Sequence, residues 1–427
     1  MVSLFGKQFG EKKVKRVYLD YAGATEVSER AKRALIDSLS VFGNPSGIHK
    51  EGAEAGQLLD KGRVLLASAL NAHTYEIYAA SSGTESCNLA VIGSYEAFIV
   101  DHSSKDGNLP HAIVSSIEHP AVLESIRMLE RKKKITVTYL PIYDNGIVKV
   151  RDVESALTDS TFLVSVMYAN NEVGTIQPIK EIGKTLEEWK KKKNLPHSAY
   201  PYFHTDACQA ANYCNLDVVR LRVHLMTVNS SKVYGPKGVA LLYKREGIKL
   251  LPISYGGGQE RGLRSGTENA ASMYSFGTAL AESVALREKE STRLRLLRDT
   301  TVASLKKAVP EIVFYGAFDE YFVAPEGVTT KVKAELRLPN NINCRVPGIT
   351  SEEMILRLDA KGFSVSHKSA CASMETEGSY VVMALGAKEE EALENIRISM
   401  GRSTTEAHME SFVEAFKSIV EKYRKTN

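Results

Sequence analysis

Short apolar runs alternate along this chain with segments of helical periodicity, and this rhythm restricts the fold more than any other feature of the sequence. The runs are apolar or β-branched, as expected of buried strands, and the segments between them have the spacing of helices. Strands that alternate with helices form a mostly parallel sheet wrapped by helices, so the sequence predicts the α/β class. The predicted strands are Tyr75–Ala80, His111–Ser116, Ile135–Leu140, Thr161–Met167, Tyr202–His204 and Val223–Val228.

The length of the chain predicts two domains. A single hydrophobic core stops growing at roughly 300 residues, and this chain has 427. We expect a large domain over residues 17–275 and a smaller α+β domain over residues 276–427. The N-terminal residues 1–16 are expected to join the smaller domain. The long charged segment Ala279–Leu305 predicts an amphipathic helix that leaves the large domain. The other elements predicted there are a strand at Leu336–Cys344, a helix at Ser351–Lys361 and a largely helical segment at Glu389–Lys425.

Charge and cysteine usage exclude several classes of function. The net charge of +4 is small, and the basic runs Arg131–Lys134 and Lys190–Lys193 follow helix-like segments, so we expect solvated helix ends and no nucleic-acid partner. The five cysteines are scattered without a CxxC pair, which predicts no metal site and favours a reducing compartment. Residues 1–16 lack a signal-peptide core, and no apolar run reaches the ~18 residues of a membrane span. We therefore expect a cytoplasmic protein without a membrane partner.

An aspartate and a lysine each follow an apolar, strand-like stretch. Asp206 ends the segment Phe203–Asp206, and Lys232 stands three residues before the glycine of Gly235–Gly238. A carboxylate at the end of one buried strand can hold a pyridine nitrogen protonated, and a lysine at the end of the next can reach the aldehyde of the same ring. The pair suggests pyridoxal 5′-phosphate, although acids and lysines also end strands in α/β proteins that bind no cofactor.

Two glycine-containing loops have the composition of anion sites. Gly83 and Thr84 lie between a predicted strand and a helix-like stretch, where free N–H groups and hydroxyls can surround a phosphate. The alternative there is an ordinary helix cap. The loop Gly256–Asn269 is glycine-rich and basic and also precedes a helix, so it too suits an anion, unless it is only a long connector.

Polar side chains follow the other predicted strands at the same edge of the sheet. His119 could stack on a ring and carry a proton near neutral pH. Asn170 and Asn171 could bind a ring oxygen or a substrate carboxylate, or could simply form a turn. Gln209 would lie one helical turn beyond Asp206 and could donate a hydrogen bond to a ring hydroxyl.

Cys371 differs from the other four cysteines, which lie in apolar or helix-like contexts typical of inert thiols. It lies in a loop of small and polar residues, Ser366–Ser379. His367 and Lys368 precede it and could lower its pKa, which would supply the nucleophilic thiolate.

In this order, the motifs resemble those of the cysteine desulfurase and selenocysteine lyase family, which has the fold of class V aminotransferases. The resemblance covers nearly the whole chain. It also includes Val17–Tyr21, Gly43–His49 and Ile396–Arg402. It implies the fold of fold-type I pyridoxal-phosphate enzymes, with a mostly parallel seven-stranded sheet and a smaller C-terminal domain.

The resemblance also implies a role for each site residue. Lys232 looks like the lysine that binds the cofactor aldehyde, Asp206 like the partner of the ring nitrogen, and His119 like the stacking acid or base. Gly83, Thr84 and, from a partner subunit, Thr267 look like phosphate ligands, which implies a homodimer. Gln209 would bind the ring hydroxyl, Asn171 the ring oxygen and substrate, and Arg397 the substrate carboxylate. Cys371 aligns with the cysteine that accepts sulfur.

The chain departs from the family pattern beside the lysine. The family usually has a histidine directly before it and a serine three residues before it, both of which contact phosphate. Here these positions are Ser231 and Asn229. Both can donate a hydrogen bond, but neither can carry an imidazolium charge. Position 22 is an alanine where the family commonly has asparagine.

The function implied is conversion of L-cysteine to L-alanine, with the sulfur left as a persulfide on Cys371. The subgroup with a similar cysteine loop usually supplies sulfur for iron–sulfur cluster assembly, so we expect an acceptor or scaffold protein as a partner. A selenocysteine lyase is the closest alternative, because the Asn170–Gly174 and Gly256–Arg261 segments are similar in those enzymes. Another enzyme of this fold, such as an aminotransferase or epimerase, is a second alternative, and a non-catalytic scaffold of the same fold is a third.

Overall fold

Seven strands form the central sheet of the computed structural model, which describes residues 16–102, 109–318, 320–323, 329–368 and 378–426. The strand order is β2-β8-β7-β6-β5-β3-β4. β8 pairs antiparallel with β7 and β2, and the other pairs are parallel, which confirms the predicted mostly parallel sheet. The strands are β2 Ile77–Ala80, β3 His111–Ser115, β4 Thr136–Leu140, β5 Thr161–Ser165, β6 Tyr202–Asp206, β7 Leu225–Asn229 and β8 Ala240–Lys244.

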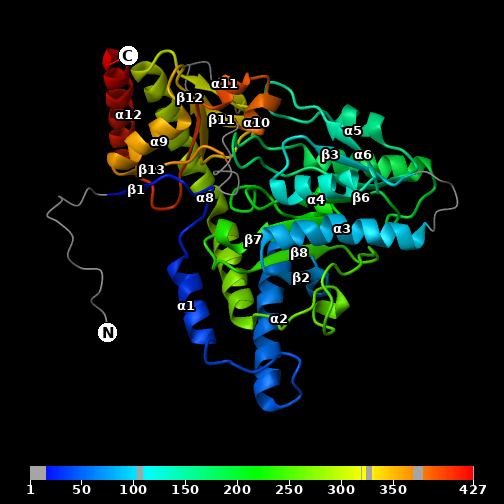
Figure 1. Ribbon diagram of the computed structural model, residues 1–427. Helices are drawn as coiled ribbons and strands as arrows, with labels where there is room; N and C mark the ends of the chain where they lie inside the picture. The colour runs from blue at the N-terminus through cyan, green and yellow to red at the C-terminus, as the bar shows by residue number, and fades with distance from the viewer. Residues whose placement is uncertain (1–15, 103–108, 319, 324–328, 369–377, 427) are drawn as a thin grey trace.

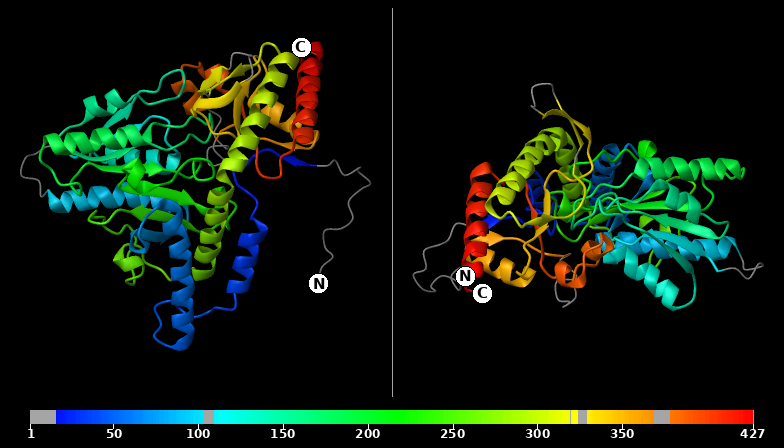
Figure 2. Two further views of the ribbon diagram at one scale, coloured as in Figure 1. Left: turned by 180° about the vertical axis from the view of Figure 1, so that it is seen from behind. Right: turned by 90° about the horizontal axis from the view of Figure 1, so that it is seen from above.

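Helices cover both faces of this sheet (Figures 1 and 2). The alternation of side chains along each strand explains why two faces need cover: Tyr202 packs in one core cluster and Phe203, the next residue, in the other. The cluster that contains Phe203 also holds residues of α2, α6, α7 and α8, and the cluster that contains Tyr202 holds residues of α3 and α4. The helices of this region are α1 Glu29–Ser38, α2 Lys50–Leu70, α3 Gly83–Asp101, α4 Pro120–Arg131, α5 Val150–Ala156, α6 Ile179–Lys192 and α7 Val218–Leu221.

Helix α8, Ala270–Ala308, connects the two parts of the fold (Figure 1). Its first half buries Phe276 and Leu280 against the large sheet, and its second half buries Leu294 and Leu305 in a separate core cluster. The helix predicted at Ala279–Leu305 is therefore confirmed and extends beyond both predicted ends.

The separate core cluster that contains Leu294 and Leu305 belongs to a smaller sheet in the order β14-β12-β9. Val17 and Leu19 lie in this cluster, and β1 pairs parallel with β13, so the start of the described chain packs on the smaller part. The division of domains between residues 275 and 276 remains a prediction. The elements here are β1 Val17–Tyr18, β9 Val313–Phe314, β10 Glu320–Val323, β11 Thr329–Ala334, β12 Asn341–Arg345, α9 Ser351–Ala360, β13 Phe363–Ser364, α10 Tyr380–Ala384, α11 Glu389–Ala392, β14 Asn395–Ser399 and α12 Glu406–Thr426.

One secondary-structure prediction missed an important strand. The segment Glu389–Lys425 is largely helical, as predicted, through α11 and α12, but β14 interrupts it and pairs antiparallel with β12. Ile396 and Ile398 both enter the core of the smaller part, with the two-residue period of a strand. In a segment this short, two alternating apolar residues are too weak a pattern to predict a strand. The correction matters because Arg397 lies on this strand and faces away from those isoleucines.

Candidate active site

A cavity of about 130 Å³ lies where strands of the large sheet end. Nine of the predicted site residues line it: Gly83, Thr84, His119, Asn171, Asp206, Gln209, Asn229, Lys232 and Arg397. The remaining lining residues are Ala22, Gly23, Ala121, Met167, Ala169 and Cys208. Residues distant in sequence therefore meet at one place, as the strand-end argument predicted.

Lys232 ends a short 3₁₀ turn, Ser230–Lys232, that follows β7. Its Nζ atom donates hydrogen bonds to the carbonyl oxygens of Ala22 at 2.8 Å and Gly23 at 2.5 Å. Burial lowers the pKa of this lysine, and the nearby charge of Arg397 lowers it further. The amine is therefore easier to deprotonate than an exposed lysine, which suits a nucleophile or a base.

Asp206 ends β6 with its side chain almost fully buried. Oδ1 accepts the backbone N–H of Cys208 at 2.9 Å, and the thiol of Cys87 lies 3.8 Å from Oδ2. Burial raises the pKa of both thiols, and the Asp206 charge raises it further. Cys208, which lines the cavity, is therefore kept as an unreactive thiol. Its apolar context in the sequence predicted only a buried, inert cysteine.

A chain of hydrogen bonds supports β6 behind Asp206. The Ser86 hydroxyl donates to a backbone carbonyl at 3.0 Å, so it accepts from the Thr227 hydroxyl at 2.8 Å. Thr227 in turn accepts from Nε2 of His204 at 3.2 Å, and Nδ1 of His204 accepts from Ser165 at 2.9 Å. Burial lowers the pKa of His204 to about 4, which agrees with the neutral ring that these hydrogen bonds require.

His119 is the residue that precedes α4 and caps its start. Its Nδ1 accepts the backbone N–H of Ala121 at 3.1 Å, which assigns the proton of the neutral ring to Nε2. Burial lowers the pKa of His119, although the charge of Asp206 opposes this shift. A neutral imidazole on the cavity wall fits both predicted tasks, stacking on a ring and moving a proton.

The start of α3 and Asn229 form the side of the cavity predicted to hold phosphate. Ser82 caps α3, and the N–H groups of Gly83 and Thr84 belong to the first turn, which has no acceptors within the helix. Oδ1 of Asn229 accepts from the N–H and the hydroxyl of Ser231, both at 3.3 Å. That arrangement leaves Nδ2 of Asn229 as the outward donor, on the side where a Cβ atom at Gly83 would approach it to 3.4 Å. Ser231 acts on the cavity through Asn229.

Arg397 is the largest fully buried side chain of the fold and lines the cavity from β14. Its Nη2 atom lies 2.7 Å from Oδ1 of Asp20, and Nη1 donates to the carbonyl oxygen of Asn171 at 3.1 Å. Its Nε atom is buried without a hydrogen-bond partner in the described structure. A substrate carboxylate could use this donor. The sequence predicts no role for Asp20, and the structure shows that this carboxylate orients the guanidinium.

Three of the predicted residues lie away from the cavity or cannot be placed. Thr267 is exposed in the loop before α8, and Ser231 does not line the cavity among the described atoms. Cys371 lies outside the described residues. His367 is described, and burial lowers its pKa. Gln209 does line the cavity, where its Nε2 atom donates to the carbonyl oxygen of Ala22 at 2.9 Å.

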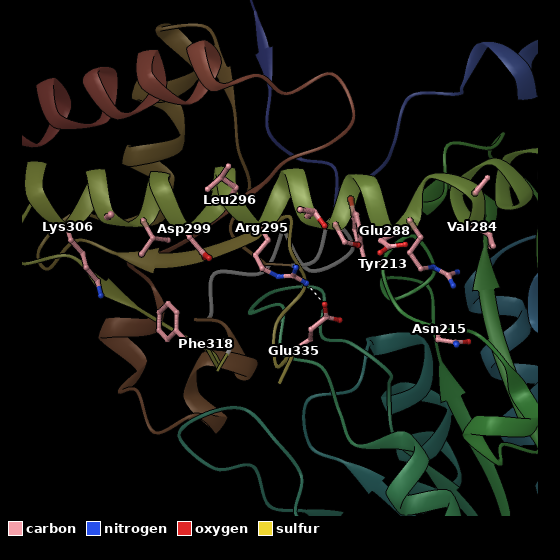
Figure 3. Close-up of a pocket in the computed structure, with 16 residues that line it drawn as sticks. Tyr213, Asn215, Val284, Glu288, Arg295, Leu296, Asp299, Lys306, Phe318 and Glu335 are labelled. Atoms are coloured by element: carbon pink, nitrogen blue, oxygen red, sulfur yellow. Dashed lines mark hydrogen bonds and ion pairs between the residues drawn. The ribbon is translucent and has the colours of Figure 1, made fainter. Parts of the chain in front are cut away.

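A larger hollow of about 1370 Å³ runs along α8 (Figure 3). An ion pair between Arg295 and Glu335 crosses it, and it contains none of the predicted site residues. Acidic and basic side chains both line it, so its charge favours no one ligand. The smaller cavity, with its convergent polar groups and shifted pKa values, is the candidate active site.

Comparison with known proteins identifies the family of this chain. The family model described as aminotransferase class-V matches residues 17–412. A cysteine desulfurase IscS from Clostridium botulinum is 36% identical over 96% of this chain and 96% of its own length. Cysteine desulfurase IscS 1 from Archaeoglobus fulgidus is 34% identical over 95% of this chain and 97% of its own length.

The fold is likewise shared with a solved structure. A NifS-like protein superimposes with a TM-score of 0.81 at 30% identity and covers 95% of this chain and 99% of its own. The resemblance predicted from the motifs and the predicted fold are both confirmed. The chain belongs to the cysteine desulfurase family of class-V aminotransferase-fold proteins.

Proposed function

We propose that this protein is a cysteine desulfurase that converts L-cysteine to L-alanine and leaves the sulfur as a persulfide on Cys371. The observation that carries the proposal is the meeting of Lys232, Asp206 and His119 in one cavity. The relatives support the proposal, because they are named cysteine desulfurases and this chain matches almost their full length.

The residues of the cavity fit pyridoxal 5′-phosphate. Lys232 would hold its aldehyde and the buried carboxylate of Asp206 its ring nitrogen. Gly83, Thr84 and Nδ2 of Asn229 would donate to its phosphate, where the start of α3 favours negative charge. When bound, the cofactor supplies an electron sink for the carbanion that forms at the substrate Cα atom.

The side chains of this protein would divide the remaining work. Arg397 binds the substrate carboxylate through its unpaired Nε, with Asp20 holding the guanidinium in place. Nζ of Lys232 removes the proton from Cα, and Nε2 of His119, which carries the proton of the neutral ring, is positioned to donate that proton at the substrate. The Cys371 thiolate attacks the substrate sulfur, so an S–S bond forms as the C–S bond breaks. The electron pair of the broken bond passes to Cβ, which takes up a proton to become the methyl group of alanine, and alanine leaves.

The proposal extends to partners. We propose a homodimer in which Thr267, exposed in this chain, reaches the phosphate bound by the other subunit. An acceptor or scaffold protein of iron–sulfur cluster assembly would remove the persulfide sulfur. The four described cysteines are free thiols, which supports a cytoplasmic location. In the described part of the chain, no helix is long and apolar enough to cross a membrane.

Product analysis tests this function. The purified protein should show visible cofactor absorbance that changes on addition of L-cysteine, and it should release alanine. Turnover of selenocysteine should be compared at equal concentration. A protein that processes selenocysteine but forms no alanine from cysteine would be a selenocysteine lyase, and a colourless protein without turnover would be a scaffold.

A further inference from the structure

Glu118 lies directly before His119 and has a completely buried side chain. Its Oε1 atom accepts two short hydrogen bonds, from the hydroxyl of Ser115 at 2.5 Å and from the backbone N–H of Met167 at 2.5 Å. Ser115 ends β3, and Met167 follows the end of β5. One carboxyl oxygen therefore joins the ends of two neighbouring strands.

The two segments that Glu118 joins form one wall of the candidate active site. His119 lines the cavity from the first segment, and Met167 and Asn171 line it from the second. The backbone carbonyl of Glu118 also accepts the hydroxyl of Tyr380 at 2.6 Å. Glu118 thus contacts three segments of chain, although its own side chain does not line the cavity.

The surroundings of the Glu118 carboxyl group favour its neutral form, which acts as a hydrogen-bond acceptor and not as a charge. Burial raises the pKa of Glu118 most, the charge of Asp206 adds to this effect, and the hydrogen bonds from Ser115 and Met167 oppose it. The resulting pKa is about 8, so the neutral acid is the main form near pH 7. The second oxygen, Oε2, is buried without a hydrogen-bond partner in the described structure, and it is the atom that would carry the proton. Oε1 then accepts as a carbonyl oxygen does.

We propose that Glu118 is a positioning residue that holds His119 and the Met167–Asn171 segment at a fixed separation across the cavity. The role of the wall in catalysis rests on the proposed function. The test of placement requires only that the cofactor binds in this cavity, so it can succeed or fail independently of turnover. The structure also contains a second link between the same segments, since Nδ2 of Asn170 donates to the carbonyl of Ile117 at 3.0 Å. Variants of Glu118 are therefore expected to fold.

The experiment compares two variants of opposite character in the cofactor-loaded protein. Glu118→Gln keeps the acceptor oxygen and the neutral state. Glu118→Asp keeps the acid but is one methylene shorter and cannot reach Ser115 and Met167 together. The readouts are the visible circular dichroism of the bound cofactor, which reports how the ring is held, and kcat and KM for L-cysteine.

We expect Glu118→Gln to retain the dichroism of the wild type and a kcat within about twofold. Glu118→Asp should change the dichroism and lower kcat by roughly 10- to 100-fold with a smaller change in KM, because a shift of about 1 Å in a catalytic group has effects of this size. Glu76→Asp is the matched control. Glu76 is a buried glutamate that also joins two segments, because it accepts the N–H groups of His73 at 2.9 Å and Glu246 at 2.8 Å. It precedes β2 and therefore lies at the end of the sheet away from the cavity. It should lose stability without a change in dichroism.

Two results would overturn the proposal. The first is a Glu118→Asp protein with unchanged dichroism and kcat. The second is a Glu118→Gln protein as impaired as Glu118→Asp, since that would show that a charge is required. If the wild type binds the cofactor but does not turn over cysteine, the proposed function fails while the dichroism still tests the placement.

Discussion

Nη2 of Arg397 lies 2.7 Å from Oδ1 of Asp20, so a residue near the start of the described chain orients the guanidinium at the centre of the cavity. Asp20→Asn removes the charge of the partner and keeps its shape. A hydrogen bond to a charged group contributes about 1.5 to 3 kcal/mol. We expect KM for L-cysteine to rise roughly tenfold, with a smaller change in kcat. Steady-state kinetics check this, and an unchanged KM would show that Asp20 does not orient Arg397 for the substrate.

Lys232→Ala should abolish turnover and remove the visible absorbance of a lysine-bound cofactor, because no other lysine lines the described cavity. Spectra and alanine release measure the two effects. Lys237→Ala is the control, since Lys237 is exposed on the neighbouring loop. Persistence of the absorbance in Lys232→Ala would assign the cofactor to another lysine.

Asn229 should control the affinity for the cofactor. Asn229→Ala loses a hydrogen bond to the charged phosphate, which contributes about 1.5 to 3 kcal/mol, so the Kd for pyridoxal 5′-phosphate should rise roughly 10- to 100-fold. Asn229→Asp places a negative charge beside the phosphate and should weaken binding further. Ser231→His restores the residue that the family usually has and should strengthen it. Titration of the cofactor-free protein by absorbance gives all three constants. Equal affinity for Asn229→Asp and the wild type would place the phosphate elsewhere.

His204 predicts an acid sensitivity. Its pKa is about 4 in the folded protein, below the ordinary value of 6.5, so the unfolded chain binds more protons between these values. Stability from the neutral ring is full above pH 6.5 and is lost as pH falls toward 4. The slope is at most about 1.4 kcal/mol per pH unit. His204→Asn should show a smaller loss over this range.

Urea unfolding of the cofactor-free protein at several pH values between 4 and 7 measures that difference. His102→Asn provides a comparison, because its ring lies outside the chain of hydrogen bonds behind Asp206. Among the described residues, that ring hydrogen-bonds the backbone carbonyl of Phe98, at 3.2 Å. Identical slopes for the wild type and His204→Asn would contradict a neutral, buried His204.

Six strands of the large sheet were predictable because they are apolar or β-branched runs, and some, such as β3 and β5, are buried on both faces. β14 was missed because only two of its residues, Ile396 and Ile398, enter the core, and its pairing with β12 depends on a contact more than 50 residues away in sequence. β8, the antiparallel strand, was not predicted either. The residues Ala240–Lys244 do not show by themselves that the strand runs antiparallel to β7.

The site was predictable where one residue type at a strand end implied one chemistry, as with Asp206 and Lys232. The carbonyl acceptors at Ala22 and Gly23 were not, because any residue offers a carbonyl and only the fold decides which ones meet Lys232. The same reason hid the role of Glu118, whose side chain acts on backbone far away in sequence. The orientation of Asn229 by Ser231 likewise needed coordinates.

The most direct test of the account is the location of the sulfur after reaction with L-cysteine. The protein is incubated with one equivalent of L-cysteine, alanine is measured, and the modified cysteine is identified by mass spectrometry of peptides. Cys344→Ser is the control, since burial raises the pKa of that thiol to about 12. If Cys371 accepts the sulfur, the wild type and Cys344→Ser should each give one persulfide on Cys371 for each alanine, and Cys371→Ser should lose both products. Alanine formation at the wild-type rate in Cys371→Ser, or a persulfide on another cysteine, would contradict this role of Cys371.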